Sequence, residues 1–298
     1  MIARRALLGG GLALTAGGAL LARVRPMPAV GLQVFPLLAQ AQADFAGTMG
    51  AIAAAGYADV ELLAGLAPPA RMAAGIRAAG LRVPSVHASA SRLYPGAPSV
   101  ADDLDQLIAT CRAVGAGTLV CSTPFVAGGV TPDRFEATLD AFGPVEWAAH
   151  AAFLNRTAET VRRAGLRLGY HNHGQEFRGR AQDLPFDRLV AATARQDVRF
   201  ELDCGWAILA GVDPVAVIDR HARRIDFLHL KDLAKDAAPG TNRTVALGDG
   251  RVDVPAIVAA GRRAGVRAMF VELEPPFAEP PLVLARRSRS FLARSVGA

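Results

Sequence analysis

The chain has 298 residues, of which 51% are hydrophobic and 20% are charged, and its formal net charge is +6 at pH 7. This length and apolar content exclude a disordered or fibrous chain and are typical of a globular protein with a sizeable core. All but two of the 33 basic residues are Arg, scattered without a block of five or six. The composition therefore does not favour a nucleic-acid-binding surface.

The N-terminal segment has the layout of a signal peptide. Arg4 and Arg5 precede an uncharged stretch, residues 6–22, that is rich in Leu, Ala and Gly. The paired arginines indicate the Tat export route. A membrane anchor is the alternative, but five glycines dilute the stretch, and a spanning helix needs about 20 apolar residues. We therefore predict an exported, periplasmic protein without a stable membrane anchor, cleaved near Ala22 or Ala29.

Removal of a signal peptide over residues 1–26 changes the electrostatic character of the chain. Four arginines and no acid leave with this segment, so the mature chain has 29 basic and 27 acidic residues and a formal charge of +2. The remaining residues, 27–298, contain no linker or low-complexity tract, and about 250 residues are typical of one α/β barrel. We predict a single domain there.

Eight short apolar or β-branched runs alternate with Ala-rich helical stretches, which is the pattern of repeated βα units around a parallel sheet. Gly, or an Ala-Gly pair, precedes several of the runs, as expected where a helix ends before a strand. The runs are Gly31–Phe35, Asp59–Leu63, Arg82–His87, Thr118–Cys121, Arg167–His171, Val198–Asp203, Asp226–Leu230 and Ala268–Leu273.

The ends of these runs favour a closed barrel over an open, doubly wound sheet. Polar side chains stand at the C-terminal ends of six runs, and in a barrel all such ends surround one mouth. An open sheet would gather its ligand between a few strands, and no Gly-rich phosphate loop follows the first run. We predict an α/β fold, a single (β/α)8 TIM barrel, with Glu61, His87, His171, Asp203, His229 and Glu272 around its mouth.

Two other features concern the loops and the thiols. Residues 122–144 contain several Pro and Gly residues and are predicted to form an extended loop able to cover the mouth. Cys111, Cys121 and Cys204 have no metal-type spacing and are predicted to be small buried apolar residues. A disulfide between Cys121 and either of the others is left open by the sequence.

The strongest local signal for chemistry is Tyr170-His171-Asn172-His173 at the end of the fifth run. The alternation of side chains along a strand directs His171 and His173 to one face and Asn172 to the other. Two imidazoles in register, with further His and acidic residues on neighbouring strand ends, favour metal binding or acid–base duty over a structural role.

Four side chains form a set of metal donors. Glu201 and Asp203 share a face of the sixth run, and Asp203 lies nearer the mouth, so it is the better ligand. Two imidazoles and two carboxylates suit Mn²⁺, Co²⁺, Zn²⁺ or Fe²⁺ rather than Ca²⁺. Such an ion would bind a substrate carbonyl and hydroxyl and stabilise an enediolate. The predicted ligands are His171, Asp203, His229 and Glu272.

Further side chains near the mouth are candidates for catalysis or substrate binding. Lys231 shares a face with His229 and can polarise a carbonyl or steady an enolate. Trp206 can stack on a sugar, and Glu274 can orient a ligand. The catalytic candidates are His87, His173, Lys231 and Glu272, and the substrate-binding candidates are Glu61, Trp206 and Glu274.

With these residues in view, the chain resembles the sugar phosphate isomerase/epimerase group of the xylose isomerase-like TIM barrels over residues 31–276. The resemblance implies a TIM barrel, a small carbohydrate substrate and a divalent metal held from strands five to eight. It is carried by Val60-Glu61-Leu62, Tyr170-His171-Asn172-His173 with Glu176-Phe177, Leu202-Asp203 with Trp206, His229-Leu230-Lys231-Asp232, Gly248-Asp249-Gly250 and Val271-Glu272.

One departure from this group bears on the reaction. Many of its epimerases present Glu where this chain has His171, and use it with the eighth-strand Glu as a pair of opposed proton carriers. Here only Glu272 of that pair is present, so epimerisation requires His173 or His87 to supply the second group. Members with the Tyr-His-Asn-His pattern also resemble enzymes that cleave 3-keto-glycosides by elimination.

Four functions follow from these patterns. The leading hypothesis is a metal-dependent isomerase or epimerase acting through an enediolate on a sugar or keto-sugar, and the alternative is a 3-keto-glycoside lyase or hydrolase, which would release an aglycone. A non-catalytic periplasmic sugar-binding protein is disfavoured because binding alone needs no metal-centred acid–base set. A nuclease resembling the AP endonucleases is disfavoured by the mature charge and the lack of a basic stripe.

Overall fold

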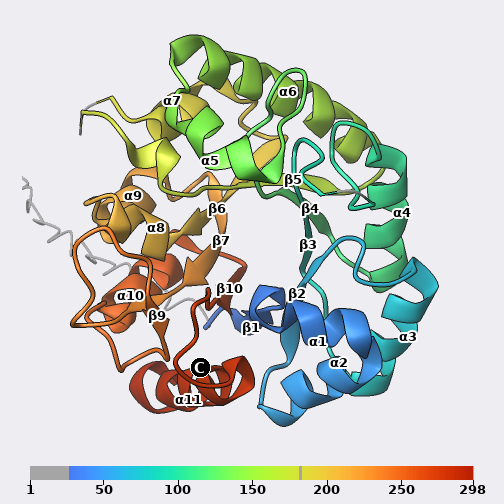
Figure 1. Ribbon diagram of the computed structural model, residues 1–298, viewed down its shortest axis with the longest axis vertical. Helices are drawn as coiled ribbons and strands as arrows, with labels where there is room; N and C mark the ends of the chain where they lie inside the picture. The colour runs from blue at the N-terminus through green and yellow to red at the C-terminus, as the bar shows by residue number, and fades with distance from the viewer. Residues whose placement is uncertain (1–26, 95, 181–182, 298) are drawn as a thin grey trace, which may run out of the picture.

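The computed structural model describes residues 27–94, 96–180 and 183–297. Eight parallel strands close into a barrel in the order β1-β10-β7-β6-β5-β4-β3-β2, and a ring of helices surrounds it (Figure 1). The predicted closed barrel is confirmed, whereas the signal peptide predicted over residues 1–26 lies outside the described residues and stays a prediction. The barrel strands are β1 (Ala29–Gln33), β2 (Asp59–Leu63), β3 (Ser85–Ala88), β4 (Thr118–Cys121), β5 (Arg167–His171), β6 (Val198–Asp203), β7 (Ile225–Leu230) and β10 (Ala268–Val271).

The helices around the barrel start and stop at residues with matching backbone preferences. Pro stands at one of the first two positions of many of them, where its missing N–H is not needed. Gly80, Gly115 and Gly265 end α3, α4 and α10 in the left-handed conformation. The helices are α1 (Leu38–Ala43), α2 (Phe45–Ala54), α3 (Pro69–Ala79), α4 (Leu104–Val114), α5 (Pro132–Asp140), α6 (Pro144–Arg163), α7 (Pro185–Ala192), α8 (Cys204–Leu209), α9 (Pro214–His221), α10 (Val254–Ala264) and α11 (Pro281–Val296), with 3-10 turns η1 (Phe35–Leu37) and η2 (Gln175–Phe177).

All eight predicted runs overlap a barrel strand, and two of the differences in their bounds have clear local reasons. The first run was predicted to reach Phe35, but Pro36 lies in the first turn of η1, so β1 ends at Gln33. The third run was predicted to start at Arg82, but Pro84 has no N–H to donate to a strand partner. Arg82 therefore forms only an isolated bridge with Asp59 before β3 begins.

The predicted loop over residues 122–144 contains a helix, α5, which corrects that prediction. Glu136 of α5 accepts a hydrogen bond of 2.6 Å from Gln175 Nε2 in η2, and Asp140 at its end forms an ion pair with Arg178. This segment is thereby fastened to the connection that follows β5.

The barrel interior holds an apolar layer below the polar strand ends. Val120, Phe227 and Phe270 belong to a small cluster separate from the main core, with the Phe227 and Phe270 ring centres 5.7 Å apart. His229 stands two residues beyond Phe227 on the same face of β7. The centre of its ring lies 6.0 Å from the centre of the Phe270 ring. The apolar layer therefore lies directly below the polar residues of the mouth and packs against them.

A buried carboxylate organises the connection between β7 and α10, which includes the short antiparallel strands β8 (Asp232–Leu233) and β9 (Thr244–Val245). Asp232 accepts four hydrogen bonds of 2.9 to 3.0 Å from the backbone N–H groups of Leu233, Gly248, Gly250 and Val252. A Cβ at residue 250 would lie 2.1 Å from Asp232 Oδ1, so only Gly fits there. We call this arrangement the Asp232 staple.

The thiols and the helices bear on two further predictions. Cys111, Cys121 and Cys204 are buried and free, which confirms that they act as small apolar residues; no disulfide joins them. Within the described ranges, no helix is long and apolar enough to cross a membrane.

Candidate active site

The strand ends bring the four predicted metal ligands together. His171 ends β5, Asp203 ends β6, His229 lies on β7 and Glu272 directly follows β10. All four are buried, and one donor atom from each lies within 4.8 Å of the others. We call these four residues the outer group.

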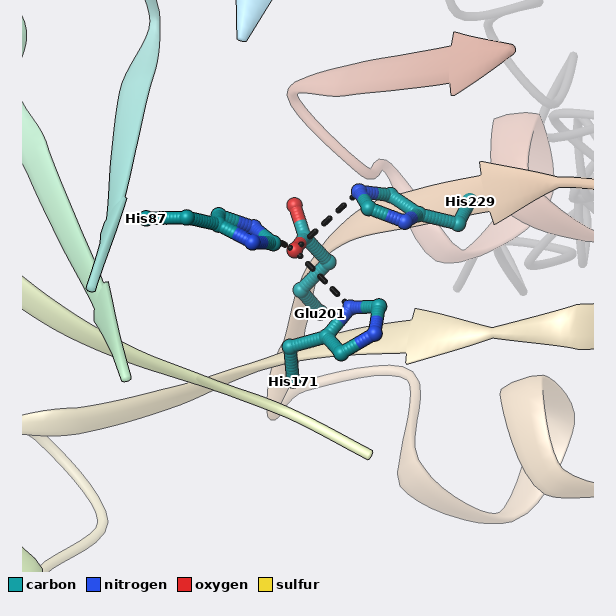
Figure 2. A group of neighbouring side chains, drawn as sticks. All are labelled: His87, His171, Glu201 and His229. Carbon is teal, nitrogen blue, oxygen red and sulfur yellow. Dashed lines mark hydrogen bonds and ion pairs between the residues drawn. The ribbon is translucent and has the colours of Figure 1, made fainter. Parts of the chain in front are cut away.

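A second set of donors, the inner group, lies beside the first and shares two of its imidazoles. It consists of His87, His171, Glu201 and His229 (Figure 2). Glu201 Oε2 lies 2.6 Å from His87 Nε2 and 3.2 Å from both His171 Nδ1 and His229 Nε2. The sequence patterns set Glu201 aside in favour of Asp203; the shared face of the two residues in β6 was the signal that could have identified it.

Glu61, a predicted substrate contact, lies with the inner group and is fully buried. Its Oε2 atom is 2.7 Å from His229 Nε2 and 2.9 Å from His87 Nε2, and its Oε1 atom accepts a hydrogen bond from Ser85. This position suits a residue that holds imidazoles in place. The substrate role of Glu61 and the catalytic role of His87 stay predictions.

Opposite charges alternate in the inner group. Burial lowers the pKa of His87, but Glu61 and Glu201 raise it to about 10. Burial also lowers the pKa of His229, and Glu201, Glu272 and Glu61 raise it well above its usual value. Burial and the charge of Glu61 raise the pKa of Glu201, but His229 and His87 bring it down to about 2. Without a metal, protonated imidazoles thus neutralise the buried carboxylates.

Lys231 offsets the negative charge of the outer group. Its Nζ lies 2.7 Å from Asp203 Oδ2 and 3.1 Å from Glu272 Oε2, and it also contacts Glu274. Burial favours the neutral amine, but Asp203, Glu272 and Glu274 raise the pKa of Lys231 well above its usual value. Burial raises the pKa of Asp203, although Lys231 lowers it. The lysine is therefore an ammonium ion held beside the predicted metal ligands.

The two shared imidazoles face both groups with different nitrogen atoms. His229 Nδ1 is 2.6 Å from Glu272 Oε2 and 3.8 Å from Asp203 Oδ2, while its Nε2 faces Glu61 and Glu201. His171 Nε2 lies 3.9 Å from Asp203 Oδ2, while its Nδ1 faces Glu201. The inner carboxylates can thus hold one N–H of each ring and leave the other nitrogen for a ligand.

The outer group fits a divalent metal ion. Asp203 Oδ2 is buried and, among the described residues, accepts no hydrogen bond of good geometry. Two imidazole nitrogens and two carboxylate oxygens are donors that Mn²⁺, Fe²⁺, Co²⁺ and Zn²⁺ share. Two imidazoles of the inner group also contact a further carboxylate, Glu61, which suits that group to orienting the outer ligands.

The mouth above the outer group is lined by partly exposed side chains that were predicted to touch substrate. Trp206 Nε1 donates a 3.1 Å hydrogen bond to Glu274 Oε1, and Lys231 Nζ lies 5.3 Å from the centre of the Trp206 ring. The His173 and Trp206 rings are 5.6 Å apart. Asn242, which no sequence pattern singled out, also donates to Glu274. Asn242 is a polar residue in a long connection, and nothing in the sequence around it indicates a contact with the site.

The Tyr170-His171-Asn172-His173 segment is braced from both sides. Asn172, predicted to point away from the site, is buried, and its Oδ1 accepts a 3.0 Å hydrogen bond from Asp203 N. Glu176 accepts a 3.0 Å hydrogen bond from His173 N and another from the Tyr170 hydroxyl. His173 Nδ1 is buried without a partner among the described residues. Burial, with Lys231, lowers the pKa of His173 to about 3, so its ring is neutral.

Comparison with known proteins places these features in a family. The sequence matches the xylose isomerase-like TIM barrel family over residues 49–295. The rhizopine catabolism protein MocC of Rhizobium meliloti is 31% identical over 169 residues, 51% of this chain and 51% of its own. An inosose dehydratase of Geobacillus kaustophilus is 34% identical over 101 residues, 34% of this chain and 32% of its own.

The chain thus spans about half of the curated relatives it matches, or less. A sugar phosphate isomerase/epimerase structure from Parabacteroides distasonis is 21% identical and superposes with a TM-score of 0.71 over 90% of this chain and 99% of its own, a likeness of fold. The family match covers most of the chain, including every strand end that contributes to the outer and inner groups. The chain belongs to the xylose isomerase-like TIM barrel family.

Proposed function

We propose that the protein is a divalent-metal-dependent enzyme that removes a proton beside the carbonyl of a keto-sugar or a related cyclic polyol, and forms an enediolate. The observation that carries the proposal is the outer group, four metal-type donors from four strand ends beside Lys231 and His173. A cation held by these donors would polarise the substrate carbonyl and acidify the adjacent C–H.

The side chains around the outer group have separable tasks. Trp206 and Glu274 bind the sugar, through the face of the indole and through hydrogen bonds to hydroxyl groups. The unpartnered Nδ1 of His173 accepts the proton from the carbon beside the carbonyl. The Lys231 ammonium stabilises the oxyanion and can donate a proton. The inner carboxylates Glu61 and Glu201 orient the imidazoles of the outer group.

Elimination is the outcome that these side chains favour. In that reaction the His173 nitrogen takes the proton, a carbon–carbon double bond forms, and the carbon–oxygen bond to the leaving group breaks. Lys231 protonates the departing oxygen, so an alcohol or water leaves. One base and one acid suffice, and the Geobacillus relative carries the name of a dehydratase. The substrate we propose is therefore a 3-keto-glycoside or an inosose-like ketone, and the class is a carbon–oxygen lyase.

Isomerisation or epimerisation is the second candidate. It requires two proton carriers on opposite sides of the substrate, and His171 replaces one of the two carboxylates that many epimerases of this family use. The position of His173 near the outer group favours this candidate, because its neutral ring can act opposite Glu272.

One experiment distinguishes the two. Metal-loaded protein is incubated with methyl 3-keto-glucoside in deuterated water and followed by proton NMR. Loss of the C2 proton with release of methanol supports the lyase. Deuterium exchange at C2 with the glycosidic bond intact supports the isomerase or epimerase. The control is Asp203→Asn, which is expected to abolish both signals by weakening metal binding. The absence of both signals with Mn²⁺, Co²⁺, Zn²⁺ and Fe²⁺ would refute a 3-keto-glycoside as the substrate.

A further inference from the structure

A cluster of arginines surrounds a recess at the end of the barrel opposite the outer group. The recess has a volume of about 480 Å³ and lies at the N-terminal ends of the adjacent strands β5, β6, β7 and β10. Its lining is Arg167, Arg195, Gln196, Arg199, Arg223, Asp226 and Arg267. Five guanidinium groups therefore meet one carboxylate, an excess of four positive charges in a chain whose formal net charge is +6.

Asp226 forms ion pairs with two of the five arginines. Its Oδ1 lies 2.7 Å from an Arg199 Nη2 atom, and its Oδ2 lies 3.6 Å from Arg267 Nη1. In the part of the chain that the structure describes, no acidic side chain forms an ion pair with Arg167, Arg195 or Arg223. Three guanidinium groups are thus available to a ligand.

The arginines repel one another in this arrangement. Burial lowers the pKa of Arg267, and so does the charge of Arg167, although Asp226 raises it. The Arg267 guanidinium also lies 5.5 Å from the centre of the Phe227 ring, so this one arginine of the recess packs against the apolar layer of the barrel. Arg167, Arg195 and Arg223 are exposed, so solvent and salt screen part of their charge, and an anion is expected to bind best at low ionic strength.

We propose that this recess is a binding site for a multivalent oxyanion, a phosphoryl compound. Guanidinium groups present paired N–H donors that match the oxygen atoms of a phosphoryl group, and several of them converging in one recess favour an anion with more than one such group. The ligand is either a free phosphorylated metabolite or an anionic lipid headgroup, since both offer the same chemistry. The site is separate from the outer group and does not depend on the proposed reaction.

The test uses inorganic pyrophosphate and isothermal titration calorimetry on the metal-loaded full chain at low ionic strength. The variant is Arg195→Gln/Arg223→Gln, because neither side chain has an acidic partner in the described ranges. The control with the same change of net charge is Arg71→Gln/Arg77→Gln, two exposed arginines of α3. We expect binding in the native protein, a loss of at least about tenfold in affinity in the recess variant, and no change in the control.

Two further measurements complete the test. Because pyrophosphate also chelates metal ions, Asp203→Asn must retain the binding; loss of binding in that variant would place the anion at the outer group and overturn the proposal. An anionic lipid headgroup is the ligand if the protein sediments with phosphatidylglycerol vesicles but not with phosphatidylcholine vesicles. Pyrophosphate should then release the protein from the vesicles. An equal loss of affinity in the α3 control, or no binding to either probe, would also overturn it.

Discussion

His229 has a carboxylate on each side of its ring, which makes it the central residue of the site. Its Nδ1 faces Glu272 and its Nε2 faces Glu61 and Glu201. An imidazole that donates one N–H to a carboxylate is held in one tautomer and one orientation, and its free nitrogen becomes a better metal ligand. In the proposed metal site, the inner carboxylates would thus influence metal affinity through His171 and His229 and not by direct coordination.

Substitution of the inner carboxylate tests this interpretation. Glu201→Gln keeps the size of the side chain and removes the charge that faces His171 and His229. We expect metal affinity to fall by about 10- to 100-fold. Competition with a fluorescent chelator measures the metal affinity of each protein. The matched control is Glu159→Gln on the exposed face of α6, and equal affinities in the two variants would contradict the role of Glu201.

The residues of the outer group were predictable because each stands at the C-terminal end of a strand, where barrel geometry brings side chains together. The inner group was only partly predictable. Strand parity places Glu201 on the same face of β6 as Asp203, but it does not tell how deep in the barrel a side chain lies. Glu201 lies deeper than Asp203, and Asp203 was therefore preferred from the sequence. The substrate role predicted for Glu61 stays a prediction, and parity alone could not reveal its contacts with His87, His229 and Ser85.

Among the larger elements, the connection between β7 and α10 depends on one side chain. The Asp232 staple satisfies four backbone N–H groups with both oxygen atoms of a single carboxylate. In Asp232→Asn an amide NH₂ would face two of these donors. Buried donors without an acceptor each cost about 1–3 kcal/mol, so we expect the free energy of unfolding to fall by about 3 kcal/mol.

Urea denaturation measures this loss. Asp253→Asn is the matched control, because Asp253 caps α10 through one 3.0 Å hydrogen bond and Asn is an equally good cap. A staple variant as stable as this control would show that the carboxylate is not required.

Helix α6 carries a buried histidine whose effect on stability depends on pH. His150 is fully buried and accepts a 3.1 Å hydrogen bond from Phe125 N. Burial lowers its pKa to about 3. The unfolded chain therefore binds a proton below pH 6.5 that the folded protein excludes, so the contribution of His150 to stability is retained above pH 6.5 and lost as the pH falls.

The expected slope is about 1.4 kcal/mol per pH unit between the unfolded and folded pKa values. His150→Asn retains an acceptor for Phe125 N and cannot be protonated. Unfolding free energies of the two proteins between pH 6.5 and pH 4.5 should thus converge as the pH falls. Parallel curves would show that His150 is protonated in the folded state.

At the scale of the whole molecule, metal binding should stabilise the fold, since the outer group joins four strands of the barrel. Free metal at one hundred times its dissociation constant adds about 2.7 kcal/mol to the free energy of unfolding. For a domain of this size we expect a rise in Tm of about 5–10 °C. Differential scanning calorimetry with and without Mn²⁺ checks this, and Asp203→Asn should show no such rise.

The closed barrel could be predicted because apolar runs, C-capping glycines and polar strand ends all agree along the chain. Helix α5 could not, because its short segment lies among Pro and Gly residues and is held by contacts with η2 that are distant in sequence. The arginine recess was missed for a related reason. Its residues are spread over 101 positions, from Arg167 to Arg267, and only the barrel brings them together.

The Asp232 staple has a consequence for how this protein can be diversified in the laboratory. Gly250 tolerates no side chain and the carboxylate accepts four amides, so random libraries that vary residues 232 and 250 should yield mainly destabilised clones. Side chains hold α5 to the connection that follows β5, and the segment has exposed positions along its length. Libraries aimed at new substrates therefore belong in residues 122–144, which contain none of the proposed metal ligands.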